Sequence, residues 1–219
     1  MKDKLVNYLK DFTWEDIKQI EENDPQFLAL KKLWKYKNDP LQFTKLVITN
    51  ALLSYQLQTK GETYWQNFAD FFALPSKTLS DFEEFISLYN KRLINQRKKR
   101  LSKISNCLNL FDNNFFFKSV DNPVFLLNFL TDCLNQKKDA KTVVFAIKMF
   151  LYAIDIIFQK HFIAPFGIMI PLDSRIKKIS ADKKFWQDVE KETQIPLLHI
   201  DSILWLPTDK DFIFIAKTN

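Results

Sequence analysis

Glycine occurs only twice in the 219 residues, at Gly61 and Gly167. Tight hairpins and phosphate-binding loops need glycines at close spacing, because glycine adopts positive φ without strain and lets the backbone approach a phosphate. The chain therefore lacks the glycine-rich loops of kinases and dinucleotide-binding folds. Hairpins must also be few, and loops that need positive φ must use Asn or Asp.

Helix-start signals recur along the chain. Thr13 and Asp16 have the spacing of a capping box, and Asp24 and Asp39 each precede a proline at a first helical position. Further helical periodicity covers residues 61–74, 79–106, 124–134, 141–160, 173–179 and the segment from 182, with a short turn after Pro196. Residues 211–217 alternate like a strand, but a lone strand has little to pair with. The predicted fold class is all-α.

Composition predicts a sizeable core, since 47% of the residues are hydrophobic and 15% are aromatic. We expect residues 1–219 to form a single domain of one core or two small lobes. The segment 109–123, "NLFDNNFFFKSVDNP", interrupts helical periodicity with Asn, Asp and Pro, so a loop or lobe crossing is expected near residues 107–123.

Charged residues interrupt the apolar positions of the N-terminus, and no window approaches the roughly 20 apolar residues of a membrane span. We expect a cytoplasmic monomer. Cys107 and Cys133 have neither metal-ligand spacing nor the number needed for a disulfide framework, so reduced core thiols are expected. No metal or dissociable cofactor is predicted.

The formal net charge is +6, and cations cluster in "NKRLINQRKKRLSK" without an acid between Asn90 and Lys103. Like charges at helical spacing repel, so an unneutralised patch indicates an anionic partner, for which a nucleic-acid backbone is suited. A solvated helix face is the alternative interpretation.

The segment 141–160 would present a mixed face if helical. At 100° per residue, six side chains fall within about 40° of one direction. They are Lys141, Phe145, Lys148, Tyr152, Asp155 and Gln159. An aromatic ring between two lysines is suited to stacking a flat base. The alternative is an ordinary surface stripe with snorkelling lysines.

The segment "IPLDSRIKK", residues 170–178, places Asp173 where an N-cap is expected. A carboxylate at a helix N-terminus is favoured as the anion. Such a fixed charge can stabilise an oxocarbenium-like sugar cation, while a neutral lysine amine serves as the nucleophile.

Together, "KTVVFAIKMFLYA" and "IPLDSRIKK" resemble the catalytic lysine and aspartate segments of the helix-hairpin-helix DNA glycosylases, most closely the archaeal 8-oxoguanine DNA glycosylase/lyase branch, AGOG. "DPQFLALKKL", "GETYWQNF" and "HIDSILWLP" resemble the family's base-pocket segments. The resemblance implies two helical lobes with the active site between them. It also implies base-excision repair of 8-oxoguanine in DNA through a lysine Schiff base and β-elimination.

By this resemblance, Lys141 is the nucleophile and Asp173 the catalytic carboxylate. The residues implied to contact the damaged base are Gln26, Trp65, Lys148 and Asp201, with Phe145 and Trp205 stacking on its two faces.

The expected contacts to the DNA backbone come from Arg97, Lys98, Lys99, Arg100 and Lys103. The hairpin "NQKKDAK" departs from the superfamily because it has no glycine, so Lys137 and Lys138 are expected to contact phosphate instead. The absence of a four-cysteine cluster excludes the iron–sulfur relatives.

Two rival interpretations remain open at this point. One is a non-catalytic, all-α nucleic-acid-binding protein in which Lys141 and Lys148 contact phosphates. The other keeps the lysine-dependent glycosylase but assigns it another oxidised base.

Overall fold

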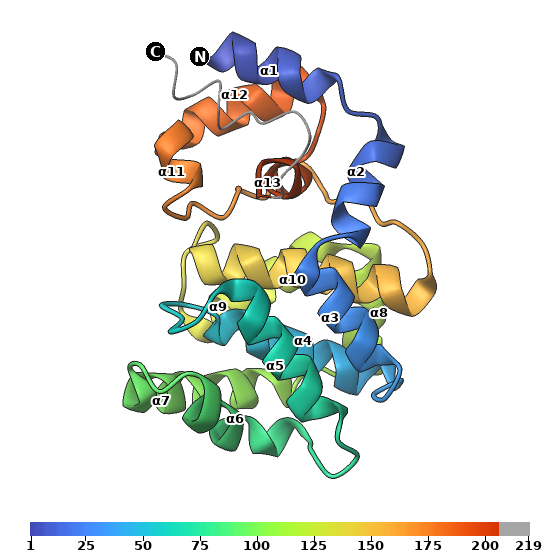
Figure 1. Ribbon diagram of the computed structural model, residues 1–219, viewed down its shortest axis with the longest axis vertical. Helices are drawn as coiled ribbons and strands as arrows, with labels where there is room; N and C mark the ends of the chain where they lie inside the picture. Colours follow the sequence, from blue (N-terminus) through green and yellow to red (C-terminus); the bar gives the residue numbers. More distant parts are fainter. Residues whose placement is uncertain (206–219) are drawn as a thin grey trace.

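The computed structural model describes residues 1–205, in which every regular element is helical (Figure 1). The helices are α1 (Lys2–Lys10), α2 (Trp14–Glu22), α3 (Pro25–Trp34), α4 (Pro40–Leu53), α5 (Gly61–Ala73), the 3-10 helix η1 (Leu79–Asp81), α6 (Phe82–Tyr89), α7 (Ile94–Leu108), α8 (Asn113–Asp121), α9 (Pro123–Leu134), α10 (Lys141–Phe158), α11 (Ile176–Ile179), α12 (Lys183–Thr193) and α13 (Leu197–Trp205). The all-α prediction is confirmed for this part of the chain. The strand-like segment 211–217 lies outside the described residues.

Local capping chemistry determines where the first helices begin. Thr13 and Asp16 form the predicted capping box at the start of α2. Asp24 accepts a hydrogen bond from the Gln26 N–H at 2.8 Å, and Asp39 accepts one from the Gln42 N–H at 2.7 Å. Each interaction satisfies a backbone donor that has no partner within the helix.

Two hydrophobic clusters divide the helices into two lobes. The larger cluster is built from α3 to α10, and the smaller from α1, the start of α2 and α11 to α13. In Figure 1, α13 lies between α10 and the α1–α12 pair. Leu198 of α13 belongs to the larger cluster while its neighbour Leu197 belongs to the smaller one, so α13 packs on both lobes.

The lobe crossing predicted near residues 107–123 is wrong. Asp112 accepts from the Phe115 N–H at 2.7 Å and begins α8, and Phe111 and Phe116 are buried in the larger cluster. The chain instead passes between lobes where α2 meets α3, and again through residues 159–169. Asp112 and Asn122, in the segment 109–123, are helix caps, so this segment is not a linker between the lobes.

The single helix predicted over residues 79–106 is also wrong, because α6 and α7 are separate. The backbone leaves helical geometry after Tyr89, and Leu93 has a φ of 55°. The side chain of Arg97 donates to the Arg92 carbonyl at 2.9 Å, which fixes this break by a contact that helical periodicity does not reveal.

The two cysteines form a disulfide, contrary to the expected reduced thiols. Cys107 at the end of α7 and Cys133 in the last turn of α9 are bonded, with Cα atoms 5.9 Å apart. Their 26-residue separation contains no pattern that pairs them. The bond depends on α7 and α9 packing side by side.

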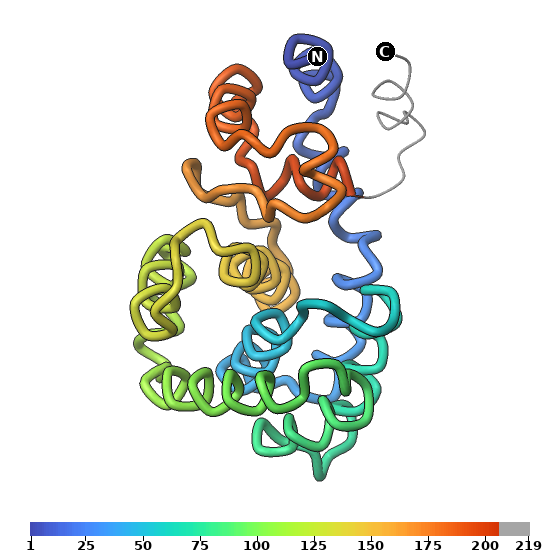
Figure 2. Tube along the Cα trace, turned by 90° about the vertical axis from the view of Figure 1, so that its left-hand side faces the viewer, coloured from blue at the N-terminus to red at the C-terminus, as the bar shows by residue number. Residues whose placement is uncertain are grey.

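Helix α10 is the central element of the larger lobe. It packs against α3, α4 and α9, and Figure 2 shows it nearly end-on, with α4 beneath it. Despite this burial, neither α10 nor any other helix within residues 1–205 combines the length and apolar character needed to cross a membrane.

Candidate active site

The mixed face of α10 leads from the surface to the interior. Lys141 is the first residue of the helix and is exposed, Phe145 one turn later is half-buried, and Lys148 is only 3% exposed. Lys141 is therefore accessible to a macromolecular substrate, while Lys148 lies behind it between the lobes.

Lys148 forms a buried ion pair with α13. Its Nζ atom donates to Oδ2 of Asp201 at 2.7 Å. Burial opposes the charged amine, yet Asp201 and Asp24 raise the pKa of Lys148 above its ordinary value of 10.5. Burial raises the pKa of Asp24 and of Asp201, while the Lys148 ammonium lowers the pKa of both. The pair therefore offers a donor and an acceptor at the lobe interface.

Asp173 caps the turn that leads into α11, as predicted. Its Oδ1 atom accepts from the backbone N–H groups of Arg175 and Ile176, each at 2.8 Å. Asp173 is near enough to Asp201 to raise its pKa, while Lys141 acts on the same carboxyl in the opposite direction. Asp201 thus lies within electrostatic range of both predicted catalytic groups. Figure 1 shows the loop before α11 above the start of α10.

Arg175 links this loop to the end of α13. Its guanidinium donates to the Trp205 carbonyl and lies 4.9 Å from the centroid of the Trp205 ring. The half-buried indole is thereby held beside the Asp173 loop. Asp201 and Trp205 are both helical, so the predicted one-turn spacing between them is confirmed.

The remaining predicted pocket residues come from α3 and α5. Gln26 is buried in the first turn of α3, and a Cβ at Gly61 would lie 3.8 Å from its Nε2 atom. Trp65 is 1% exposed, and its ring meets Phe145 edge-on with centroids 6.0 Å apart. The first turns of α3 and α5 thus lie together, and Trp65 packs against the α10 ring. The roles of these residues toward a base remain predictions.

The predicted contact of Arg97 with the DNA backbone is wrong. Arg97 is 0% exposed, and its guanidinium donates to the carbonyls of Leu53 at 2.8 Å, Gln56 at 3.2 Å and Tyr55. A side chain so enclosed cannot reach a phosphate. Its role is to hold the loop after α4.

The other predicted DNA-contacting cations remain nearer the surface. Arg100 is half-buried and donates to the Leu52 carbonyl at 3.0 Å, and Lys98 pairs with Glu83. Lys99 and Lys103 line a surface cavity of about 390 Å³ that also includes Gln136 of the hairpin. Lys137 and Lys138 are exposed.

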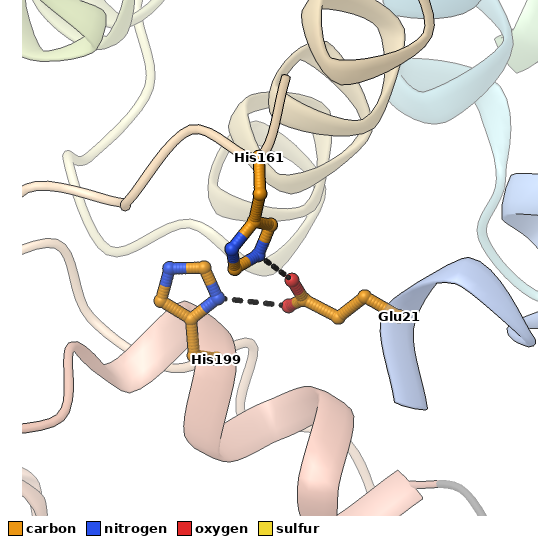
Figure 3. Close-up of side chains that lie close together, drawn as sticks. All are labelled: Glu21, His161 and His199. Carbon is orange, nitrogen blue, oxygen red and sulfur yellow. Dashed lines mark hydrogen bonds and ion pairs between the residues drawn. The ribbon is translucent and has the colours of Figure 1, made fainter. Parts of the chain in front are cut away.

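Several buried polar residues near this site were not predicted from sequence. They are Glu21, His199 and Ser202, and hydrogen bonds join them to the half-buried His161; Figure 3 draws Glu21 and the two histidines. Tyr152 donates to Asp24 at 3.0 Å and lies 3.2 Å from Ser202, connecting this group to the surroundings of Lys148. Tyr152 was noted on the polar face of α10 and Asp24 as a cap, but Glu21, His161 and His199 carry no local sequence signal.

A comparison of folds defines the class of protein. The crystal structure of 8-oxoguanosine-complexed Pa-AGOG, an 8-oxoguanine DNA glycosylase from Pyrobaculum aerophilum, matches with a TM-score of 0.83 and 27% identity. The match covers 94% of this chain and 86% of that one. The fold is that of a helical DNA glycosylase.

Sequence comparisons identify the family. The AGOG family model, described as N-glycosylase/DNA lyase, matches residues 6–212. N-glycosylase/DNA lyases from Nanoarchaeum equitans and Thermococcus kodakarensis are each 42% identical, over 94% and 93% of this chain and 90% and 82% of their own lengths. That of Methanococcus maripaludis is 38% identical over 99% and 92%. The chain belongs to the AGOG family of N-glycosylase/DNA lyases.

Proposed function

We propose that this chain removes 8-oxoguanine from DNA and then cleaves the strand at the resulting site, with Lys141 as nucleophile and Asp173 as the catalytic carboxylate. The observation that carries the proposal is the group of charges around Asp201, which is paired with Lys148 at 2.7 Å and whose pKa is affected by Asp173 and Lys141. The family and the 8-oxoguanosine-bound relative support this choice of substrate.

The chemistry follows from an exposed amine and a fixed carboxylate that both lie within electrostatic range of Asp201. The neutral Lys141 amine forms a bond to the sugar C1′ as the bond from C1′ to the base breaks, and the departing base takes up a proton. Loss of the lysine proton and opening of the sugar give a Schiff base, whose β-elimination breaks the C3′–O bond. Asp173, held by two backbone N–H groups, stabilises the cationic sugar.

Base recognition uses the lobe interface. Rotating a base out of the helix costs a few kcal/mol, which stacking between Phe145 and Trp205 offsets in part. The edge of the base would meet the Lys148–Asp201 pair, with Gln26 and Trp65 completing the pocket. A donor and an acceptor already paired 2.7 Å apart can bind complementary groups on a purine edge without a rearrangement of charge.

The DNA backbone would contact exposed cations around the hairpin and α7. Lys137 and Lys138 lie in the hairpin itself, and Lys99 and Lys103 line the cavity next to it. Lys98 and Arg100 are placed to contribute less, because each already has a protein partner. We propose that residues 1–219 act as one glycosylase domain, as a cytoplasmic monomer without a metal or dissociable cofactor.

Borohydride trapping tests the mechanism directly. Wild-type protein incubated with 8-oxoguanine duplex and borohydride should give a covalent adduct, which Lys141→Gln should abolish. Lys160→Gln, which removes an exposed lysine just beyond the other end of α10, is the matched control and should retain the adduct. A wild-type protein without an adduct, or an undiminished adduct for Lys141→Gln, would refute the proposed chemistry.

The same assay separates the rivals. A non-catalytic DNA-binding protein would bind the duplex but give neither an adduct nor strand cleavage. Duplexes that each carry a different oxidised base test the substrate. Faster excision of a base other than 8-oxoguanine would contradict the substrate assignment while leaving the lysine mechanism intact.

A further inference from the structure

Glu21 lies where a carboxylate is intrinsically unfavourable. It is in the last turn of α2 and only 3% exposed. The C-terminal end of a helix carries partial negative charge, and burial removes the water that stabilises an anion. An apolar residue would be less costly here on both counts, so specific partners must compensate.

Those partners come from two other segments, and Figure 3 draws the two histidines among them. One carboxylate oxygen, Oε2, lies 2.8 Å from Nε2 of His161, in the segment after α10. The other, Oε1, lies 2.9 Å from Nδ1 of His199 and 2.8 Å from the Ser202 hydroxyl, both on α13. Burial alone would raise the pKa of Glu21, but the two histidines lower it far below its ordinary value of 4.5. We call these four residues the Glu21 cluster.

The ligand atoms of Glu21, His161 and His199 lie within 4.8 Å of one another, which is compatible with a metal ion. Proton positions argue otherwise. The backbone N–H of Ala164 can only donate, and it meets Nε2 of His199 at 2.9 Å. His199 must therefore carry its proton on Nδ1 and donate it to Glu21. A metal at Nδ1 would shift that proton to Nε2 and oppose it to the Ala164 N–H, so a hydrogen-bonded cluster fits better.

The cluster holds one side of α13, and the predicted base contacts occupy another. On a helix with 100° per residue, His199 and Ser202 lie about 60° apart, while Asp201 and Trp205 lie about 40° apart. The midpoints of the two pairs are about 110° apart. Fixing His199 and Ser202 therefore fixes the rotation of α13, and with it the direction in which Asp201 faces α10.

The cluster is also connected to the pocket through side chains. Ser202 is 3.2 Å from the Tyr152 hydroxyl, which donates to Asp24 at 3.0 Å. Asp24 in turn caps α3 through the Gln26 N–H and acts on the pKa of Lys148. Three helices that carry predicted base contacts thus share one buried polar network with Glu21.

We propose that Glu21, through His161, His199 and Ser202, is a positioning residue for base recognition, which holds α13 so that Asp201 and Trp205 face α10. This inference rests on the proposed function, since its readout is excision of a base. Lys141 and Asp173 lie outside the cluster, so the effect of Glu21 is on base binding and excision and not on the lysine chemistry that follows.

Two substrates separate these steps. A duplex with 8-oxoguanine requires the pocket, whereas a duplex with a preformed abasic site requires only Lys141 and its surroundings. Glu21→Gln keeps the size of the side chain but replaces one acceptor oxygen with a donor. It should weaken binding of 8-oxoguanine duplex and slow single-turnover excision by about tenfold or more, because a hydrogen bond to a charged group is lost. Cleavage of the abasic duplex should stay within about twofold.

Glu22→Gln is the matched control, because it removes the neighbouring, exposed carboxylate of α2 and should leave both reactions unchanged. Ser202→Ala removes one bond to Glu21 without disturbing its charge and should show the same selective loss to a smaller degree. Ser202→Ala also tests the proposal if Glu21→Gln does not fold.

Equal losses on both substrates would show that Glu21 supports the fold in general, and an unchanged excision rate would show that it positions nothing; either result overturns the proposal. Stoichiometric Zn²⁺ binding that is lost in His161→Gln would overturn the hydrogen-bonded assignment as well. If the wild-type protein cleaves abasic DNA but does not excise 8-oxoguanine, the proposed function fails and not the positioning role.

Discussion

Lys148→Met would remove a buried cation that interacts with two buried acids. The Nζ atom is 2.7 Å from Asp201, and Asp24 is near enough to raise the pKa of the same amine. Breaking a buried ion pair by deleting one partner costs about 3–5 kcal/mol, because the remaining charge has lost its compensation. The expected loss lies at the upper end of that range, since two carboxylates are left and not one.

Asp201→Asn should cost less, about 1–3 kcal/mol, because Lys148 retains Asp24 and the amide oxygen of the introduced side chain can still accept. Urea unfolding of both variants and of the double variant gives the coupling free energy, which we expect to be about 2 kcal/mol or more. Acid should partly restore Lys148→Met, since burial already raises the pKa of both carboxyls and protonation removes their charge.

Three results would refute this reasoning. The first is a coupling free energy below about half a kcal/mol, which is the typical error of additivity for independent sites. The second is a larger loss of stability for Asp201→Asn than for Lys148→Met. The third is a Lys148→Met variant that is no more stable relative to wild type at pH 5 than at pH 8. The first would mean that the pair is not formed in solution, and the others that Asp24 does not share the lysine.

Four further perturbations test other parts of the structure. Arg97→Lys should lower the free energy of unfolding by several kcal/mol without changing the salt dependence of DNA binding, whereas Lys103→Gln should reduce the salt slope by about one and leave stability within about 0.5 kcal/mol. Burial raises the pKa of Asp155 to about 8 from an ordinary 3.8, so the stability of the wild-type protein falls as the pH rises through that interval. In thermal unfolding, Asp155→Asn should therefore stabilise the protein by at most about 6 kcal/mol at pH 9, at about 1.4 kcal/mol per pKa unit, and have little effect below pH 4. Reducing the Cys107–Cys133 disulfide, which joins residues 26 apart, should lower the free energy of unfolding by about 3 kcal/mol in urea titrations, and Cys107→Ala/Cys133→Ala should be insensitive to reductant.

Helix starts were predictable because their chemistry is local. A capping side chain and the N–H that it accepts are two or three residues apart, so Thr13, Asp24 and Asp39 were identified from sequence. The same chemistry was missed at Asp112, where the run of Asn and Asp resembled a linker although it begins α8. What separates a cap from a linker there is the burial of Phe111 and Phe116, which depends on the rest of the lobe.

The candidate site shows the same limit at longer range. Its members on α10 were grouped correctly by helical spacing, but the partner of Lys148 was proposed only as another contact of the base. The Glu21 cluster joins residues 140 and 178 positions apart, and neither a single glutamate nor a single histidine indicates such a partner. The disulfide likewise joins two residues that no sequence pattern pairs. These contacts are properties of packing, which one sequence does not display.

The basic run on α7 shows why a cluster of charge does not by itself identify its counter-charge. Arg97 and Arg100 donate to the carbonyls of Leu53 and Leu52, the last two residues of α4, where a helix leaves acceptors unsatisfied and carries partial negative charge. Arg100 also donates to Thr142 Oγ1 at 2.8 Å, next to Lys141. The partner that the cations on α7 were predicted to need is thus supplied in part within the chain, by the carbonyl groups at the end of α4. By joining α4 to the first turn of α10, these arginines contribute to the position of the proposed nucleophile, and the exposed lysines around them remain the predicted contacts to phosphate.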